Sequence, residues 1–230
     1  MQQDLAVAMV TNCRQPVLLR TVVSQWVGWG IPVYVSTDMG GVSALSPIES
    51  SLLHIKNQSV SSKDHGKAFA DALRRAGETS GWVLRQDDDI IGEYQDASRQ
   101  VLGIRMEPDS VSGVRLLDPS GRRWYDWAKF DSAGATLLSY KDKHDQSYVT
   151  GGAQLISRGA LDVVAATYEE NSQHRTASDA KACLAARQAG YSILSPNESG
   201  PAFIHLDPKR MVNVPHAFSQ DNKPKDLQCS

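Results

Sequence analysis

The sequence predicts an α/β domain with a mainly parallel central sheet, flanking helices and an antiparallel hairpin in its second half. Strand and helix patterns alternate over the first ninety residues, which is typical of parallel sheets. The strands are short, continuous apolar runs, as expected of strands buried on both faces. With 230 residues, 41% of them hydrophobic, the chain is long enough to bury a large core without disulfides or metals.

The first strand is predicted at Leu5–Thr11, a continuous apolar run. The next segment, Gln15–Trp29, has apolar residues at helical spacing and ends near Gly28 and Gly30. Gly40-Gly41 predicts a turn. The remaining patterns predict strands at 31–36, 52–55 and 81–85, and a helix from about 64 to 76 that ends at Gly77. In such sheets, ligands bind beyond the carboxyl ends of the strands.

The second half begins with a predicted hairpin. Val111–Leu117 and Trp124–Trp127 flank Asp118-Pro119-Ser120-Gly121, a strong turn signal. Later patterns predict a strand region at 148–157 broken by two glycines, helices at 158–169 and 178–189, and strands at 191–194 and 202–205. The polar tail at 219–230 is expected to fray.

The net charge, the cysteines and the lengths of the apolar runs argue against several kinds of site and segment. The net charge is −2, which provides no strong global basic field for nucleic acid, although it leaves room for a local basic patch. Cys13, Cys183 and Cys229 are widely spaced, which argues against a disulfide framework or a structural zinc site. No segment approaches the ~20 apolar residues of a membrane helix, so no membrane insertion is expected. The apolar run at 5–10 is too short for a signal peptide, and the sequence predicts a cytoplasmic protein.

Three adjacent carboxylates, Asp87, Asp88 and Asp89, follow the strand that begins at Gly81. Their charges repel one another, so a fold keeps them together only with compensation. A divalent cation such as Mg²⁺ or Mn²⁺ prefers such oxygen ligands and would in turn hold a diphosphate. The alternative is a solvated acidic turn.

Here a resemblance becomes specific. Leu5–Thr11 followed by Gly81–Asp89 resembles the A-type (GT-A) nucleotide-sugar glycosyltransferases and their DxD motif. Tyr148–Ser157 is similar to the glycine-rich acceptor-side motif of their fringe and β-galactosyltransferase-like branch, and Ser178-Asp179 to its acidic motif before a helix. Phe203-Ile204-His205 resembles the late histidine of the metal shell. These matches span roughly residues 5 to 206 and imply one GT-A-like domain over 1–218.

The resemblance implies a set of metal ligands for Mn²⁺ or Mg²⁺. Asp89 would bind the metal directly, and Asp87 would contact the metal through water or the donor ribose, with Asp88 supporting the pair. His205 would be a third protein ligand through an imidazole nitrogen. Two alternatives stand beside this role: a satisfied core histidine at 205, or His216 as the ligand.

The resemblance also implies a general base. Asp179 would remove a proton from the acceptor hydroxyl as it attacks the anomeric carbon, which implies inversion at the sugar. Ser178 stands where the family usually has Glu, so one carboxylate replaces two. In the alternative, Asp179 only stabilises the first turn of a helix, with Ser178 as its N-cap.

Donor and acceptor sites are assigned to different parts of the chain. The donor-binding part is expected at about 1–110, with Thr11 and Arg14 near the nucleotide base, and the acceptor part at about 111–218. Lys209 and Arg210 are the best candidates for contact with the diphosphate.

The expected acceptor-binding residues are Trp124, Trp127, Gly151 and Gly152. Aromatic faces, including that of the neighbouring Tyr125, stack on sugars and bases alike. The alternatives are that the aromatic residues pack the hairpin onto the core, and that the glycines form a bulge or turn.

The sequence therefore predicts a metal-dependent glycosyltransferase that moves a sugar from a nucleotide-diphosphate donor, expected to be a UDP-sugar, to an acceptor hydroxyl. A glycan precursor and a hydroxymethylated base in phage DNA are both candidate acceptors. A nucleotidyltransferase is one alternative, although no glycine-rich phosphate loop follows the first strand. A non-catalytic nucleotide- or sugar-binding module of the same fold is the other.

Overall fold

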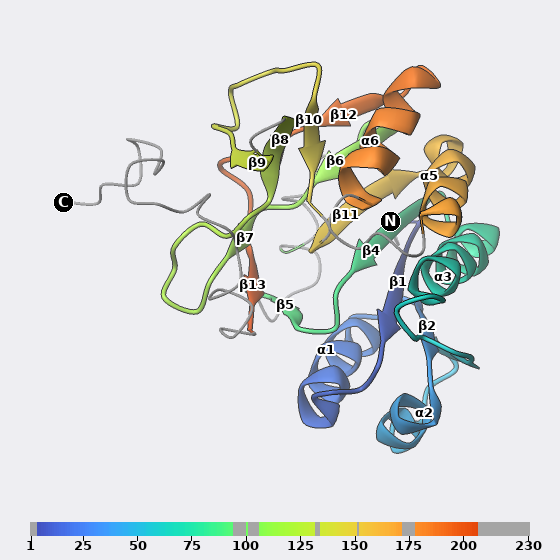
Figure 1. Cartoon of the computed structure of the whole chain (residues 1–230). Coiled ribbons are helices and arrows are strands. Elements are labelled where there is room, and N and C mark those ends of the chain that lie inside the picture. The colour runs from blue at the N-terminus through green and yellow to red at the C-terminus, as the bar shows by residue number, and fades with distance from the viewer. Residues whose placement is uncertain are drawn as a thin grey trace.

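The computed structural model describes residues 4–93, 100, 106–131, 134–150, 152–171 and 178–206. They form an α/β domain in which a mainly parallel sheet is flanked by helices (Figure 1). The predicted fold class is therefore confirmed. Most predicted elements differ from the observed ones by only one to three residues at their ends.

The central sheet has seven strands in the order β12-β6-β11-β4-β1-β2-β3. Their bounds are Leu5–Thr11 for β1, Val33–Thr37 for β2, Leu53–Asn57 for β3, Trp82–Gln86 for β4, Ser110–Gly113 for β6, Ala153–Ser157 for β11 and Ser192–Leu194 for β12. Strand β11 pairs antiparallel with both β4 and β6, and the other neighbouring strands pair in parallel. The carboxyl ends of β1, β2 and β4 consequently meet at one edge.

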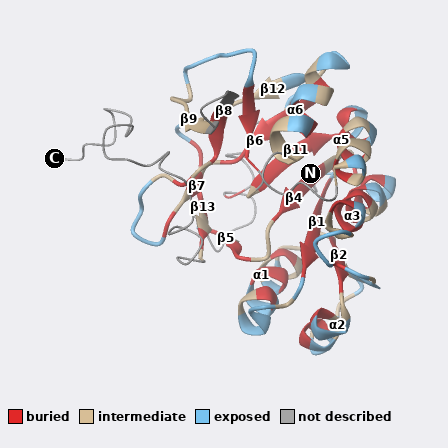
Figure 2. Cartoon of the chain, viewed as in Figure 1, coloured by how far each residue is buried: buried red, intermediate tan, exposed pale blue. Residues whose placement is uncertain are grey.

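Helices cover both faces of this sheet because the side chains of β1 alternate between two apolar clusters. Leu5, Val7 and Met9 join the cluster that includes α1 (Pro16–Gly28) and α2 (Met39–Leu45). The intervening β1 side chains join the cluster built on α3 (His65–Thr79), α5 (Arg158–Glu170) and α6 (Ser178–Gln188). In Figure 2 the buried residues are concentrated in the strands and on the inner sides of the helices.

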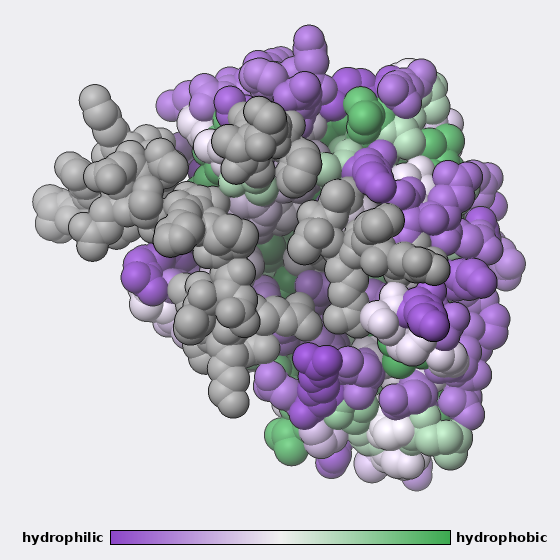
Figure 3. Space-filling view, in the orientation of Figure 1, coloured by the Kyte–Doolittle hydropathy of each residue, from purple (hydrophilic) through white to green (hydrophobic). Residues whose placement is uncertain are grey.

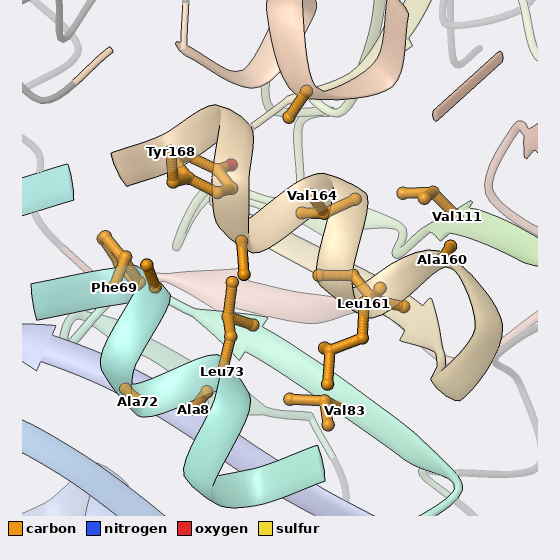
Figure 4. Close-up of a cluster of buried hydrophobic side chains, with 14 of the residues drawn as sticks. Ala8, Phe69, Ala72, Leu73, Val83, Val111, Ala160, Leu161, Val164 and Tyr168 are labelled. Carbon is orange, nitrogen blue, oxygen red and sulfur yellow. The ribbon is translucent and has the colours of Figure 1, made fainter. Parts of the chain in front are cut away.

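Helices α3 and α5 pack closely against each other over the sheet. Leu73 of α3 and Leu161 of α5 are at most 1% exposed, and Figure 4 shows them between the two helices and above Val83 of β4. A Cβ atom on Gly77 would lie 2.0 Å from Cδ2 of Leu161, so this position requires glycine for the close approach. Gly77 does not end α3 as predicted, because the helix continues to Thr79. The glycine at this position is explained by packing instead.

Two small sheets complete the domain. The first, in the order β10-β8-β9, is antiparallel and consists of Ser147–Val149, Trp127–Asp131 and Gly134–Leu137. The second, in the order β5-β13-β7, consists of Ile90–Gly92, Phe203–His205 and Leu116–Leu117. An antiparallel hairpin in the second half is thus present, formed by β8 and β9.

The predicted hairpin around Asp118 is only partly correct. Its turn exists, with Gly121 at φ +80° and the Asp118 carboxylate accepting hydrogen bonds from the backbone N–H groups of Ser120 and Arg122. Its first strand, however, divides between two sheets as β6 and β7. Across the turn, an isolated bridge between Leu117 and Arg123 stands in place of the longer ladder that was predicted.

The stretch around Gly40-Gly41 is helix α2 and not the predicted turn. Asp38 caps this helix, because its side chain accepts a hydrogen bond from the backbone N–H of Gly41. The methyl and hydroxyl groups of Thr37 leave no room for a Cβ at Gly41, so here glycine reflects close packing.

The surface is mostly hydrophilic where the described residues are visible, with small and separate apolar spots (Figure 3). The large hydrophobic side chains exposed in the described ranges are Val17, Met39 and Leu184. In the same part of the chain, none of the helices combines the length and the apolar character needed to cross a bilayer.

Candidate active site

The acidic triplet forms the turn between β4 and β5, at the carboxyl end of β4. The backbone N–H of Asp87 donates to the carbonyl of Gly152 at 3.0 Å. The buried Gln86 side chain closes the turn by donating from Nε2 to the carbonyl of Ile90 at 2.6 Å. The turn is therefore fixed on one side by Gly152, which precedes β11, and on the other by Ile90 of β5.

Asp89 lies beside His205 because β13 pairs antiparallel with β5, with His205 opposite Ile90. The Nε2 atom of His205 is 3.6 Å from Oδ1 of Asp89, and each residue is 3% exposed. The backbone N–H of Leu206 also donates to the carbonyl of Asp89 at 2.7 Å. Residues far apart in the chain are thus brought together by one strand pairing.

Trp124 lies against the imidazole of His205. The two rings stack with centroids 4.6 Å apart and an interplanar angle of 22°. The backbone of Trp124 donates to Leu116 of β7, which is paired with β13, so the same small sheet carries both rings. Trp124 is therefore a neighbour of the Asp89–His205 pair.

The end of β1 is tied directly to the acidic turn. The Thr11 hydroxyl donates to Oδ2 of Asp88 and accepts from the backbone N–H of Cys13 at 2.9 Å. Arg14 follows on an exposed part of the same loop. A hollow of about 450 Å³ lies next to this loop and is lined by Gln15, Pro16, Val17, Leu18, Thr21 and Leu206.

Arg85 is a buried cation beneath the turn. Alternation along β4 places its side chain on the same face as that of Asp87, and its Nη2 is 3.5 Å from Oδ1 of Asp87. Its guanidinium lies over the ring of Phe69 at 4.3 Å and near that of Tyr168 at 5.6 Å. Its Nε and Nη1 have no hydrogen-bond acceptor within the described part of the chain, so these aromatic faces are its principal support.

Electrostatics keep this guanidinium charged. Burial lowers the pKa of Arg85, but the surrounding acidic groups outweigh burial and raise the pKa above its ordinary value. The carboxylates among them are, in decreasing order of effect, Asp87, Asp179 and Asp89. The buried positive charge of Arg85 therefore interacts with carboxylates of both the acidic turn and α6.

Asp179 occupies the first turn of α6 and is half-buried. The hydroxyl of Tyr168, on α5, lies 2.8 Å from Oδ1 of Asp179. Burial and the nearby Asp179 raise the pKa of Tyr168 well above its usual value, so this hydroxyl keeps its proton. The carboxylate is thus oriented by a neighbouring helix, which a simple first-turn role does not require.

The other predicted site residues are more dispersed. Trp127 is 2% exposed in the core, where its indole N–H donates to the carbonyl of Asp142 at 3.2 Å, which matches the packing alternative. Gly152 is half-buried, and a Cβ there would approach Leu116 to 2.8 Å. The remaining predicted residues lie outside the described ones: Gly151, Lys209, Arg210 and the rival ligand His216.

The Asp89–His205 pair fits a divalent cation as two of its ligands. It offers one carboxylate oxygen and one imidazole nitrogen, both of which Mn²⁺ accepts. Within the described residues, no three His, Cys, Asp or Glu side chains converge as a complete metal site. A metal on this pair would therefore need further ligands from a bound substrate, from water or from elsewhere in the chain.

Arg85 and Tyr168 were not predicted as site residues, although each had a signal in the sequence. Arg85 is a charged residue within an apolar strand, two positions before Asp87 and hence on the same face. Tyr168 continues the apolar face of α5 set by Leu161, Val164 and Ala165, so it reads as core until Asp179 is placed beside it.

Comparison with known proteins supports the fold. No family model and no curated protein sequence matches this chain. A crystal structure of GalNAc-T7 with UDP, GalNAc and Mn²⁺ is similar over 88% of this chain, with a TM-score of 0.64 and 10% sequence identity. The alignment covers 44% of that protein, so this chain spans less than half its length.

This likeness, together with the sheet order, shows a GT-A-like fold. At 10% identity it bears on the fold alone and does not distinguish the fringe-like branch from others. It provides no support for modified DNA as an acceptor.

Proposed function

We propose that this protein is a metal-dependent glycosyltransferase that moves a sugar from a UDP-sugar to an acceptor hydroxyl with inversion. One observation carries the proposal: a buried Asp89–His205 pair lies at the carboxyl end of β4, where α/β sheets bind ligands. The similar GalNAc-T7 structure contains UDP and Mn²⁺, which supports a nucleotide-sugar donor and a divalent metal.

On the donor side, Asp89 and His205 would hold the cation, with Asp87 contacting it through water or contacting the ribose. When bound, the cation neutralises the charge that develops on the departing nucleoside diphosphate. Thr11 anchors Asp88, which keeps the turn against β1. The hollow between α1 and Leu206 supports placement of the base there, near Arg14.

On the acceptor side, Asp179 would act as the general base. Its carboxylate removes the proton of the acceptor hydroxyl while that oxygen attacks the anomeric carbon, and the bond from that carbon to the diphosphate oxygen breaks. Attack from the face opposite the leaving group inverts the anomeric centre. Trp124, which stacks on His205 and is 8% exposed, would contact the sugar beside the metal-binding pair.

The proposal is tested by measuring UDP release from a panel of UDP-sugars with Mn²⁺, with Mg²⁺ and with chelator. Saccharide acceptors and hydroxymethylated DNA are compared at two salt concentrations, because DNA binding weakens strongly with salt. We expect metal-dependent UDP release that increases with one acceptor class. The anomeric configuration of the product, determined by NMR, tests inversion.

Two other results would argue against a glycosyltransferase. Release of pyrophosphate from a nucleotide would indicate a nucleotidyltransferase. Metal-dependent binding of UDP-sugars without turnover on any acceptor would indicate a binding module of the same fold.

A further inference from the structure

The hydroxyl of Tyr168 lies between two hydrogen-bond acceptors. Oδ1 of Asp179 is at 2.8 Å and Oε1 of Gln154 is at 2.9 Å. A tyrosine hydroxyl carries one hydrogen but also has lone pairs, so it can donate to one group while it accepts from another. The Tyr168 hydroxyl can therefore donate its hydrogen to Oε1 of Gln154 while it accepts a hydrogen bond from Asp179.

The orientation of Gln154 is fixed by its own hydrogen bond. Its Nε2 donates to the backbone carbonyl of Val149 at 2.8 Å, which leaves Oε1 directed at Tyr168. The Gln154 side chain is fully buried in β11, so water does not compete for this oxygen. An acceptor for the Tyr168 proton is thus present whether or not Asp179 accepts it.

The ring of Tyr168 is held in place, so only its O–H bond is free to turn. Tyr168 is 2% exposed and packs against Phe69 with centroids 5.8 Å apart and an interplanar angle of 34°. Figure 4 shows the two side chains as neighbours, Phe69 on α3 and Tyr168 on α5. The guanidinium of Arg85 lies beside both rings. Rotation of one hydrogen costs far less than movement of a buried aromatic side chain.

We propose that Tyr168 is a positioning residue that holds Asp179 in both of its protonation states, with Gln154 as the alternative acceptor. This inference rests on the proposed role of Asp179 as the base. Before transfer, the Tyr168 hydroxyl donates to the Asp179 carboxylate. After Asp179 has taken the acceptor proton, its own O–H donates to Tyr168, whose hydrogen turns to Gln154.

No covalent bond to Tyr168 forms or breaks in this cycle. The proton from the acceptor hydroxyl stays on Asp179 until solvent removes it, and Tyr168 keeps its own proton throughout. The raised pKa of Tyr168, caused by burial and by Asp179, is in keeping with a hydroxyl that stays protonated. The carboxyl group therefore keeps its orientation across the reaction.

The test is steady-state kinetics of Tyr168→Phe, Gln154→Met and the double variant, with Asp179→Asn alongside. We expect Tyr168→Phe to lower kcat by about 10- to 100-fold, the range for a misoriented catalytic group, and to leave the KM for the donor unchanged. Gln154→Met should lower kcat less. In the double variant Gln154→Met should add nothing, because its partner hydroxyl is already absent.

Tyr34→Phe is the matched control. Tyr34 is also a buried tyrosine in the same cluster, 6% exposed, but its hydroxyl pairs with that of Thr79 at 2.8 Å. Its kcat should equal that of wild type. Thermal stabilisation by UDP and Mn²⁺, measured for every variant, reports whether the fold and donor site are intact.

The outcomes separate this inference from the proposed function. If Asp179→Asn abolishes transfer but Tyr168→Phe keeps wild-type kcat, or if the Tyr168 and Gln154 effects simply add, the positioning role is wrong. If Asp179→Asn keeps wild-type turnover, or wild type transfers nothing, the proposed function fails and this inference fails with it.

Discussion

Asp89 and Asp179 are both carboxylates of the candidate site, but their surroundings differ. Asp89 is 3% exposed in a turn after β4 and lies 3.6 Å from an imidazole nitrogen. Asp179 is half-buried in the first turn of α6 and lies 2.8 Å from a tyrosine hydroxyl. The neighbour of Asp89 is another metal-ligand type, and the neighbour of Asp179 is a hydrogen-bond donor.

Asp89 and Asp179 are the same residue type, so it is their surroundings that distinguish their proposed roles. A carboxylate beside an imidazole is suited to share a cation. A carboxylate that a hydroxyl orients at the surface of the domain is suited to take a proton from a substrate. Arg85 lies within the field of both groups and offsets the negative charge of the site as a whole.

The largest expected effect comes from removing the base. Asp179→Asn keeps the size and the hydrogen-bonding capacity of the side chain but not its basicity, so turnover should fall by about 10²- to 10⁴-fold. Stabilisation by UDP and Mn²⁺ should remain, because the Asp89 side is untouched. UDP-release kinetics and thermal shift measure the two effects on the same sample.

Asp162→Asn is the control for this variant, since Asp162 is an exposed carboxylate on α5. It should behave as wild type in both assays. Loss of UDP binding in Asp179→Asn would show that the two carboxylates do not have separate roles.

The next effect concerns the segment that carries Trp124. Asp126 is 1% exposed and accepts from the Arg123 guanidinium, the backbone N–H of Leu116 and the Tyr140 hydroxyl. Asp126→Ala leaves Arg123 as an unpaired buried charge, so the free energy of unfolding should fall by about 3–5 kcal/mol. Urea unfolding measures this loss.

Asp145→Ala, at an exposed position, is the control and should change stability little. If Asp126→Ala unfolds at the same urea concentration as wild type, the buried pair does not hold this segment. Because the segment presents Trp124 to His205, the variant should also weaken metal-dependent UDP binding, whereas Asp179→Asn should not.

The smallest effect is the pH dependence of the Asp118 turn. Burial raises the pKa of Asp118, but hydrogen bonds from the Ser120 hydroxyl and from Arg122 outweigh burial and lower it below 3.8. The native pKa is lower than the unfolded one, so the stabilisation is present above the unfolded pKa and is lost as pH falls through the native value.

The stability difference between wild type and Asp118→Ala should therefore shrink as the pH falls from about 5 to about 3. Urea unfolding at several pH values measures it. A difference that grows as the pH falls would contradict this account of the turn.

Much of the fold was predictable because its signals are local. In the first ninety residues, apolar runs, helical spacing and glycines determine the elements, and parallel pairing follows from their alternation. The division of 111–117 between two sheets was not predictable, since it depends on pairing with β11, β12 and β13, which follow much later in the chain.

The candidate site divides in the same way. The position of Asp87–Asp89 at a strand end follows from local pattern, and His205 was named through the family resemblance. The contact between Tyr168 and Asp179 depends on how α5 packs against α6, and the setting of Arg85 depends on Phe69 of α3. The sequence shows Arg85 as a charge within an apolar strand and Tyr168 on an apolar helix face, but it does not show which side chains they contact.

The most direct test of the central claim is thermal unfolding with UDP, with Mn²⁺ or with chelator, on wild type and Asp89→Ala, with Asp162→Ala as the control. A ligand at 100 times its dissociation constant adds about 2.7 kcal/mol to the free energy of unfolding, which raises the melting temperature by several degrees. We predict metal-dependent stabilisation of wild type and control that Asp89→Ala lacks. Equal stabilisation of Asp89→Ala, or none in wild type, would contradict a metal-nucleotide site on the Asp89–His205 pair.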